Sequence, residues 1–264
     1  MGELPSPATP RARSALAAAM AEPARTLVAL DFDGTLAPIV SRPECAAAHP
    51  GAADALAGLV AAGFRLAVIT GRPVADVLRL GPGFADVPGL VIYGHYGLEQ
   101  WVDGELTAPR VHPGVAPAKA AVRALARAHE GVDVEDKGHS VALHTRNAPD
   151  PGAAFADLRP RARQIGTEND LEVVPGRFVL ELRPPGMDKG GALRGLIAES
   201  GVRAVVFAGD DLGDLPAVRA LRELDVAGVV VCSDSPETPD ELRQAADLVV
   251  DGPEGVIGLL RSMA

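Results

Sequence analysis

The chain has 264 residues and a formal net charge of −10, from 35 Asp and Glu against 25 Lys and Arg. Without long basic runs it lacks the cations that neutralise nucleic acid or an anionic membrane surface, so neither partner is expected. With 47% hydrophobic and 23% charged residues the chain is not disordered, and its length suits one large or two modest domains.

Residues 1–26 are expected to form a helical or loose lead-in. Their apolar stretch, residues 15–21, follows two arginines and faintly resembles a secretion signal, but it is short and leads into a strand. Cys45 and Cys232 lie far apart and match no disulfide framework, and no apolar run approaches the roughly 18 residues that a membrane helix needs. A cytoplasmic location is therefore expected.

Both ends of the chain alternate short apolar runs with helical patterns. Strands are predicted at residues 27–30, 65–70, 90–93, 203–208, 226–232 and 248–250, with helices at 52–62, 73–79, 215–222, 239–246 and 254–262. Continuous apolar runs are typical of strands buried on both faces of a sheet. The alternation predicts an α/β fold, with a doubly wound, Rossmann-like parallel sheet covered by helices on both faces.

The middle of the chain has a different order. Helices are predicted at 115–129 and 153–165, and strands at 132–135, 140–144, 171–174 and 177–182, with the second hairpin turning at Pro175-Gly176. The order α-β-β-α-β-β indicates an α+β unit, and prolines flank it on both sides. We therefore expect an inserted domain at residues 110–186, which interrupts a core made of residues 1–109 and 187–264.

The strongest motif is Asp31-Phe32-Asp33-Gly34-Thr35, at the carboxyl end of the first predicted strand. Ligands of open parallel sheets bind beyond the carboxyl ends of the strands, and residues i and i+2 of a strand point the same way. Asp31 and Asp33 should therefore project together. Two close carboxylates repel unless a cation lies between them, which favours a Mg²⁺ site over a simple strand-end turn.

A second acidic cluster, Gly209-Asp210-Asp211-Leu212-Gly213-Asp214, follows the strand at 203–208. It could supply further metal ligands, with Asp210 binding directly and Asp211 or Asp214 binding directly or through water. A solvated loop in which Asp214 caps a helix is the alternative. Two acidic clusters at two strand ends make that alternative the weaker one.

Two further segments complete a possible phosphate site. Thr70-Gly71-Arg72 closes the second predicted strand, where a hydroxyl and backbone N–H groups can hold a phosphoryl oxygen. Lys189 begins the segment that returns to the core, and it is one of only three lysines in the chain. A compact ammonium suits a position that serves both a carboxylate and a phosphoryl group.

The chain resembles the haloacid dehalogenase-like phosphatases, whose four motifs match, in order, residues 31–35, Thr70, Lys189 and residues 209–214. Within that superfamily the chain resembles the trehalose-6-phosphate phosphatases, through DFDGTLAPI at 31–39, TGRP at 70–73, GLE at 97–99, SVALHTRN at 140–147, LELRP at 180–184 and KGGAL at 189–193. The resemblance implies a haloacid dehalogenase-like core with an inserted α+β cap domain.

Two stretches depart from the family pattern. The family often has Ser-His-Gly or Asn-His-Gly before Leu-Glu, whereas this chain has Gly94-His95-Tyr96-Gly97, which leaves open whether His95 or Tyr96 faces the sugar. The metal loop often ends in Thr-Asp-Glu, whereas here it ends in Gly213-Asp214-Leu215. The second difference barely affects the predicted ligands.

The residues and the resemblance together predict a mechanism. Asp31 would attack phosphorus and become an aspartyl phosphate, while Asp33 would act as general acid and then as general base. Mg²⁺, bound by Asp31, the Asp33 backbone carbonyl and Asp210, would neutralise the transferring group together with Lys189 and Thr70.

The predicted substrate is a small sugar phosphate, trehalose 6-phosphate, and the protein is expected to act as a monomer. The predicted sugar contacts are Lys137, His144, Arg146 and Glu181 from the insert, and Gly71, Arg72 and His95 from the core. A cross-strand ion pair is the alternative for Glu181 and Arg146. The rival functions are a phosphatase for another sugar phosphate, a phosphorylation receiver and a sugar-phosphate binder without catalysis.

Overall fold

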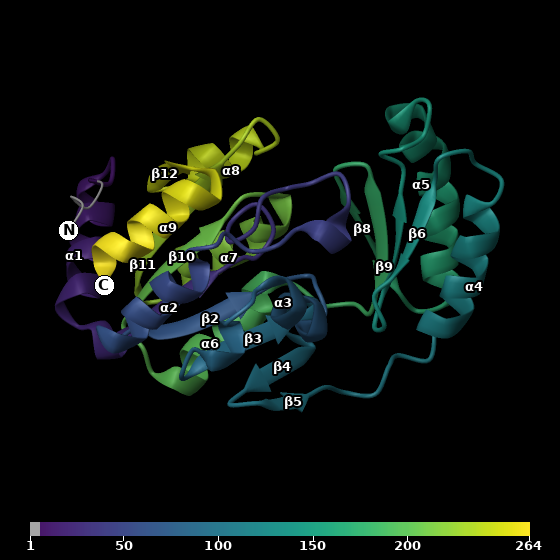
Figure 1. Cartoon of the computed structure of the whole chain (residues 1–264). Helices are drawn as coiled ribbons and strands as arrows, with labels where there is room; N and C mark the ends of the chain where they lie inside the picture. The colour runs from purple at the N-terminus through teal and green to yellow at the C-terminus, as the bar shows by residue number, and fades with distance from the viewer. Residues whose placement is uncertain (1–5) are drawn as a thin grey trace. The chain divides into compact units, whose positions relative to one another are not determined.

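The computed structural model describes residues 6–264, which form two compact units (Figure 1). The core unit contains residues 6–108 and Asp188–Ala264, and the inserted unit contains Pro109–Met187. Much of the expected lead-in is a helix, α1 (Pro10–Ala21), whose first turn is capped by the Thr9 side chain. Residues 1–5 of that lead-in lie outside the described part of the chain.

The core unit is built on one large sheet with the order β12-β11-β10-β1-β2-β3-β4-β5. Its strands are β1 (Thr26–Leu30), β2 (Arg65–Ile69), β3 (Leu90–Gly94), β4 (Glu99–Val102), β5 (Glu105–Thr107), β10 (Ala204–Gly209), β11 (Ala227–Asp234) and β12 (Leu248–Asp251). Strands β12 to β3 are mutually parallel, and β4 and β5 add an antiparallel edge. The predicted α/β fold class is confirmed.

Helices cover both faces of this sheet. One face packs against α1, α2 (Ala52–Ala61), α3 (Val74–Leu80) and α9 (Gly252–Met263), and the other against α6 (Lys189–Ser200), α7 (Leu215–Glu223) and α8 (Asp240–Ala245). Short 3-10 helices are η1 (Pro23–Arg25), η2 (Pro43–Cys45), η3 (Phe84–Asp86), η4 (His95–Gly97) and η5 (Leu212–Asp214).

The central strand shows how the sequence divides the core. Val28 and Leu30 of β1 belong to one apolar cluster and Leu27 and Ala29 to the other, because successive side chains point to opposite faces. All four are buried, so the strand requires the continuous apolar run that predicted it.

Two core elements escaped prediction. The β4–β5 hairpin turns at Asp103-Gly104, both with positive φ (48° and 88°), which is the Asp-Gly signature of a tight hairpin. Helix α6 begins at its N-cap Asp188 and ends at Gly201 in the left-handed conformation. Its two early glycines weaken the helical pattern that the sequence presents.

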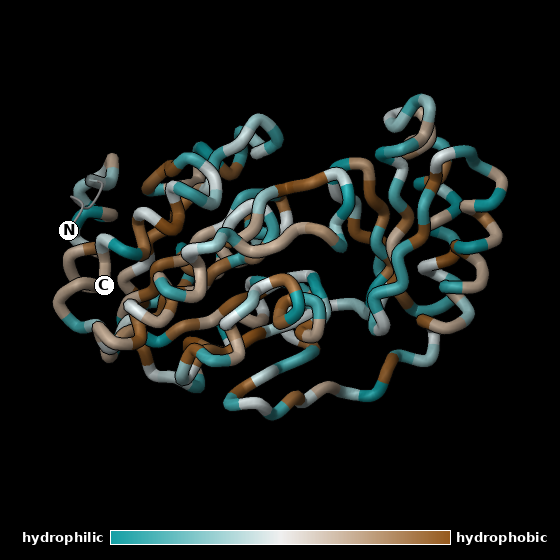
Figure 2. Tube along the Cα trace, viewed as in Figure 1, coloured by the Kyte–Doolittle hydropathy of each residue, from teal (hydrophilic) through white to brown (hydrophobic). Residues whose placement is uncertain are grey.

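The inserted unit is an antiparallel sheet covered by two helices. It contains α4 (Val115–Ala126), α5 (Pro151–Glu168), β6 (Asp133–Asp136), β7 (Val141–His144), β8 (Glu172–Gly176) and β9 (Val179–Arg183), with the strand order β6-β7-β9-β8. Figure 2 shows both hydrophobic and hydrophilic residues along these strands. Residues such as Leu143 and Leu180 pack against the helices, which leaves the other sheet face to polar side chains.

The second hairpin of the inserted unit turns two residues later than predicted. Pro175 and Gly176 lie inside β8, and the chain reverses at Arg177-Phe178, where Phe178 has a φ of 59°. Strand β8 is an edge strand, where a proline without an N–H is tolerated. Among residues 6–264 no helix is both long and apolar enough to cross a membrane.

Candidate active site

The turn after β1 brings the two acidic clusters of the core together. Asp31 continues the pairing with β10, because its N–H donates to the Ala208 carbonyl at 2.9 Å. Gly34 has a φ of 72°, and a Cβ there would lie 2.0 Å from Asp210 Oδ2, so only glycine fits. Ser233, at the end of β11, donates to the Gly34 carbonyl at 2.6 Å. Ser233 was not predicted from the sequence, although it too lies at the carboxyl end of a strand.

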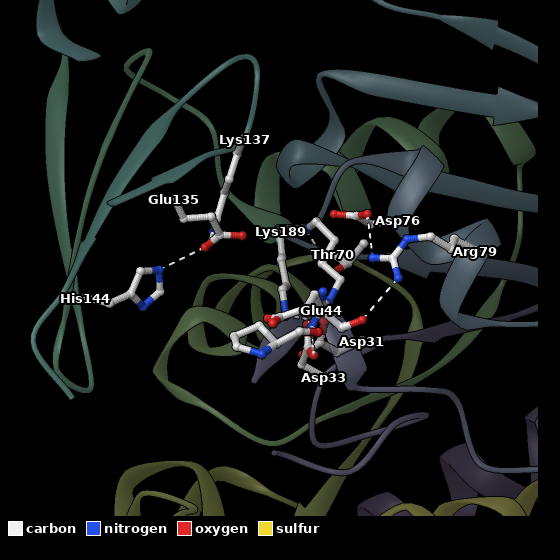
Figure 3. A network of polar contacts seen from close by, with 12 residues as sticks. Asp31, Asp33, Glu44, Thr70, Asp76, Arg79, Glu135, Lys137, His144 and Lys189 are labelled. Atoms are coloured by element: carbon white, nitrogen blue, oxygen red, sulfur yellow. Dashed lines mark hydrogen bonds and ion pairs between the residues drawn. The ribbon is translucent and has the colours of Figure 1, made fainter. Parts of the chain in front are cut away.

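A buried lysine lies between the carboxylates. Asp31, Asp210 and Asp214 are all buried, and each offers an oxygen within 4.8 Å of the others. The Nζ of Lys189, the first residue of α6, lies 2.7 Å from an oxygen of Asp31 and 2.7 Å from an oxygen of Asp214. Figure 3 shows Lys189 reaching toward Asp31 near Asp33 and Thr70. One ammonium therefore pairs with two of the three carboxylates, Asp31 and Asp214.

Asp214 is held by the protein through both oxygens. Oδ1 accepts from Lys189, and Oδ2 accepts from the backbone N–H groups of Asp210 and Asp211 at 2.9 and 3.1 Å. This arrangement fixes the lysine and the loop that carries Asp210. Asp211 is exposed and caps η5 by accepting from the N–H of Gly213. Direct metal binding by Asp211 or Asp214 stays a prediction.

Burial changes the pKa values of the charged groups in this site. It raises the pKa of Asp210 well above its usual range, and the negative charges of Asp211 and Asp31 add to the rise. Burial raises the pKa of Asp31 in the same way, although Lys189 opposes it. Burial alone would lower the pKa of Lys189, but Asp214 and Asp31 outweigh burial and raise it, so the ammonium stays charged.

The residues of this site fit a hard divalent cation. Within residues 6–264, no hydrogen bond or ion pair reaches the carboxylate of Asp210, which is 4% exposed. A buried carboxylate without a partner is unfavourable unless a cation compensates it. The potential donors are oxygen atoms of Asp31, Asp210 and the neighbouring backbone, which is the donor type that Mg²⁺ prefers.

The segment after β2 contributes a hydroxyl and a guanidinium. Thr70 is buried, and its Oγ1 accepts from the N–H of Arg72 at 3.2 Å. The Arg72 side chain binds both carboxylate oxygens of Asp33 at 2.6 Å. A Cβ on Gly71 would lie 2.6 Å from the hydroxyl oxygen of Tyr96, so the glycine permits the close approach of that ring. The structure thus brings Arg72 to the second aspartate of the motif.

The loop after β3 is strained and tied to this segment. His95 and Tyr96 both have positive φ values (47° and 57°), which are unusual for non-glycine residues. Their N–H groups donate to the backbone carbonyls of Arg72 at 2.9 Å and Thr70 at 2.8 Å. His95 is buried at 1% exposure with Glu99 3.6 Å from its Nε2, whereas Tyr96 is half-buried. Sugar contact by His95 stays a prediction.

The predicted sugar contacts of the inserted unit form a polar cluster on its sheet. Lys137 lies 3.6 Å from Glu181 and 3.9 Å from Glu135, and Ser140 donates to Glu181 at 2.6 Å. Ala142 of β7 pairs with Glu135 of β6 and with Glu181 of β9, so these two side chains lie on the same face, on the two strands that flank β7. Glu135 and Ser140 were not predicted from the sequence, although the alternation of polar and apolar residues in β6 indicates Glu135.

The other two predicted contacts of the inserted unit differ in exposure. His144 lies 2.9 Å from Glu135 through its Nε2, as Figure 3 shows, and is half-buried. Arg146 is exposed and follows the end of β7. A role of either residue in sugar binding stays a prediction.

The fold is that of the haloacid dehalogenase-like hydrolases. One such hydrolase from Bacteroides thetaiotaomicron superposes with a TM-score of 0.63 at 18% identity, covering 91% of this chain and all of that one. The C-terminal domain of a trehalose-6-phosphate phosphatase from C. albicans superposes with a TM-score of 0.78 at 20% identity, covering 99% of both chains. Likenesses at these identities establish the fold alone.

Sequence comparison establishes the family. A family model described as trehalose-phosphatase matches residues 29–247. The trehalose-phosphate phosphatase of Mycobacterium avium is 38% identical over 222 residues, which are 77% of this chain and 53% of that protein. An uncharacterized glycosyl hydrolase of Mycobacterium tuberculosis is 38% identical over 253 residues, which are 91% of this chain and 18% of that protein.

The chain therefore belongs to the trehalose-phosphatase family, which confirms the resemblance found in its motifs. It spans about half the length of the curated phosphatase from Mycobacterium avium.

Proposed function

We propose that the chain is a Mg²⁺-dependent phosphatase that hydrolyses trehalose 6-phosphate to trehalose and phosphate. The observation that carries the proposal is a buried group in which Asp31 and Asp210 follow two adjacent parallel strands and Lys189, from the start of α6, contacts Asp31. Its donor atoms suit both a divalent cation and a phosphoryl group. Membership of the family supports the substrate.

The proposed reaction has two displacements at phosphorus. A carboxylate oxygen of Asp31 forms a bond to phosphorus as the bond to the sugar oxygen breaks, and Asp33 gives its proton to that oxygen. Asp33 then takes a proton from water, which attacks the aspartyl phosphate and releases phosphate and the free Asp31 carboxylate. Lys189 and the Thr70 hydroxyl stabilise the phosphoryl oxygens in both steps. Mg²⁺ bound by Asp31, Asp210 and the Asp33 carbonyl would supply additional positive charge for these oxygens.

We propose that the inserted unit acts as the cap domain and recognises the sugar. Lys137 offers three donors and Glu181 offers acceptors, and a disaccharide presents many hydroxyl groups that pair with both. The two side chains already lie 3.6 Å apart, so hydroxyl groups would exchange with an existing ion pair. Action as a monomer in the cytoplasm belongs to the same proposal, and the free thiols of Cys45 and Cys232 agree with a reducing compartment.

The proposal is tested by phosphate release from a panel of sugar phosphates, with and without EDTA. We expect the highest kcat/KM for trehalose 6-phosphate and loss of activity in EDTA that added Mg²⁺ restores. Rapid turnover of another sugar phosphate with trehalose 6-phosphate untouched would contradict the substrate. Full activity in EDTA would contradict the role of the metal.

A further inference from the structure

The guanidinium of Arg72 binds both carboxylate oxygens of Asp33. Nε donates to Oδ2 and Nη2 donates to Oδ1, both at 2.6 Å. Such a planar, two-point contact fixes the position of the carboxylate and also the plane in which it lies. The Arg72 side chain is 10% exposed and that of Asp33 is 38% exposed, so solvent reaches the aspartate more readily than the arginine.

Arg72 is itself held by several elements of the core. Its Nη2 also donates to the Pro43 carbonyl of η2 at 2.9 Å, and its Cζ lies 5.7 Å from the centroid of the Phe32 ring. Its backbone N–H donates to Thr70, and its backbone carbonyl accepts from His95. Because these contacts fix the Arg72 side chain, its guanidinium also fixes the position of the Asp33 carboxylate.

We infer that Arg72 is a positioning residue, which orients Asp33 for proton transfer to the leaving oxygen and from the attacking water. The inference rests on the proposed function of Asp33 as the general acid and base. The ionised carboxylate accepts both hydrogen bonds from Arg72, and when one oxygen carries a proton the other still accepts one, so Arg72 keeps contact with Asp33 in both roles. A sugar contact by Arg72 stays a prediction from the sequence, and the structure shows its guanidinium bound to Asp33.

A double-mutant cycle separates positioning from substrate contact. Steady-state kinetics are measured for Arg72→Met, Asp33→Asn and the double variant, with folding checked by circular dichroism. If Arg72 acts through Asp33, Arg72→Met lowers kcat by about 10- to 100-fold and changes KM by less than about twofold. In the Asp33→Asn background the second substitution then has little further effect, because the group that it positions is already absent.

Two further variants test whether the two-point contact is needed and whether loosening of η2 explains the loss. Arg72→Lys keeps the charge but loses the two-point contact, so it should restore part of kcat and fall short of the wild type. Arg79→Met is the matched control, because Arg79 donates to the Glu44 carbonyl of the same η2 segment and pairs with Asp76, as Figure 3 shows. It should keep the wild-type kcat, which excludes loosening of η2 as the cause.

Other outcomes overturn the inference. Independent, multiplying losses in the double variant, or a rise in KM at unchanged kcat, would make Arg72 a direct substrate contact. Full activity of Asp33→Asn would remove the role that Arg72 serves. If the wild type hydrolyses no sugar phosphate, the substrate proposal fails separately, and the same cycle on p-nitrophenyl phosphate still tests whether Arg72 acts through Asp33 as the base that activates water, because that step does not depend on the leaving group.

Discussion

The polar cluster of the core and that of the inserted unit are built in opposite ways. In the core, Asp214 is fixed by two backbone N–H groups and a buried lysine, and Asp31 continues the hydrogen bonding of a central strand. In the inserted unit, Lys137 and Glu181 meet through their side chains, on the sheet face opposite the one that packs against α4 and α5. The first arrangement is imposed by the topology, and the second depends on which side chains occupy that face.

The core cluster therefore suits the chemical step, and the cluster of the inserted unit suits the choice of substrate. Groups held by strand ends and backbone N–H groups cannot move far, so they suit a reaction whose geometry is fixed. The side chains of Lys137 and Glu181 are 15% and 7% exposed, and ligand hydroxyl groups could replace the contact between them, so such a pair suits recognition of a variable sugar. Substitutions in the core cluster should therefore slow the hydrolysis of every phosphate ester, and substitutions in the inserted unit should slow the hydrolysis of some esters only.

The largest effect is expected for Asp31→Asn. The amide cannot act as the nucleophile, so kcat should fall by about 10³-fold or more for sugar and aryl phosphates alike. Phosphate release under saturating substrate measures the loss. Equal activity of the variant and the wild type would remove Asp31 from the reaction.

Lys189→Met should reduce both activity and stability. The substitution leaves the buried carboxylates of Asp31 and Asp214 without their cation, and breaking a buried pair costs about 3–5 kcal/mol. Urea unfolding in EDTA measures the free energy of unfolding. Lys119→Met is the matched control in the inserted unit, where the partner Asp136 is 39% exposed and also contacts Arg123, so its loss should be smaller.

Lys137→Met should change specificity without changing the chemistry. It removes the ammonium beside Glu181, and the kcat/KM for trehalose 6-phosphate should fall by about tenfold. Hydrolysis of p-nitrophenyl phosphate, which has no sugar, should remain within about twofold of the wild type. Equal losses on both substrates would place Lys137 in the chemistry and abolish the contrast between the two clusters.

The smallest effect concerns the stability of the metal-free protein. Burial and nearby charges raise the pKa of Asp210 in the folded state, so its contribution to stability is present at low pH and is lost as the pH rises through that pKa. In EDTA, Asp210→Asn should raise Tm by roughly 2–4 °C at pH 8, and by less at pH 6. A lower Tm of the variant at pH 8 would show that the ionised carboxylate stabilises the empty site.

The core could be predicted because its signals are local. The run from Leu27 to Leu30 is apolar throughout, and Asp31 and Asp33 follow it directly, so strand, burial and strand-end chemistry all lie within a few residues. The Asp103-Gly104 turn was equally local and was missed because its flanking strands, with Glu99 and Glu105, are weakly apolar. Pro175 misled the prediction because an edge strand accepts a proline.

The partners of the site residues could not be predicted, because the contacting residues lie far apart in the sequence. Arg72 and Asp33 are 39 positions apart, and nothing in either segment indicates that a guanidinium spans the two. Ser140 and Glu181 are 41 positions apart, and nothing in either segment indicates that the hydroxyl donates to the carboxylate. Both contacts depend on rotamers that only the packed structure selects.

The central claim is that phosphate leaves the sugar by way of Asp31. The most direct measurement is rapid acid quenching of the wild-type enzyme during turnover of trehalose 6-phosphate, followed by mass spectrometry of its peptides. The account predicts a phosphoryl group on Asp31 in the wild type, and none in Asp31→Asn. Turnover with the phosphoryl group on another residue, or with undiminished phosphate release by Asp31→Asn, would contradict it.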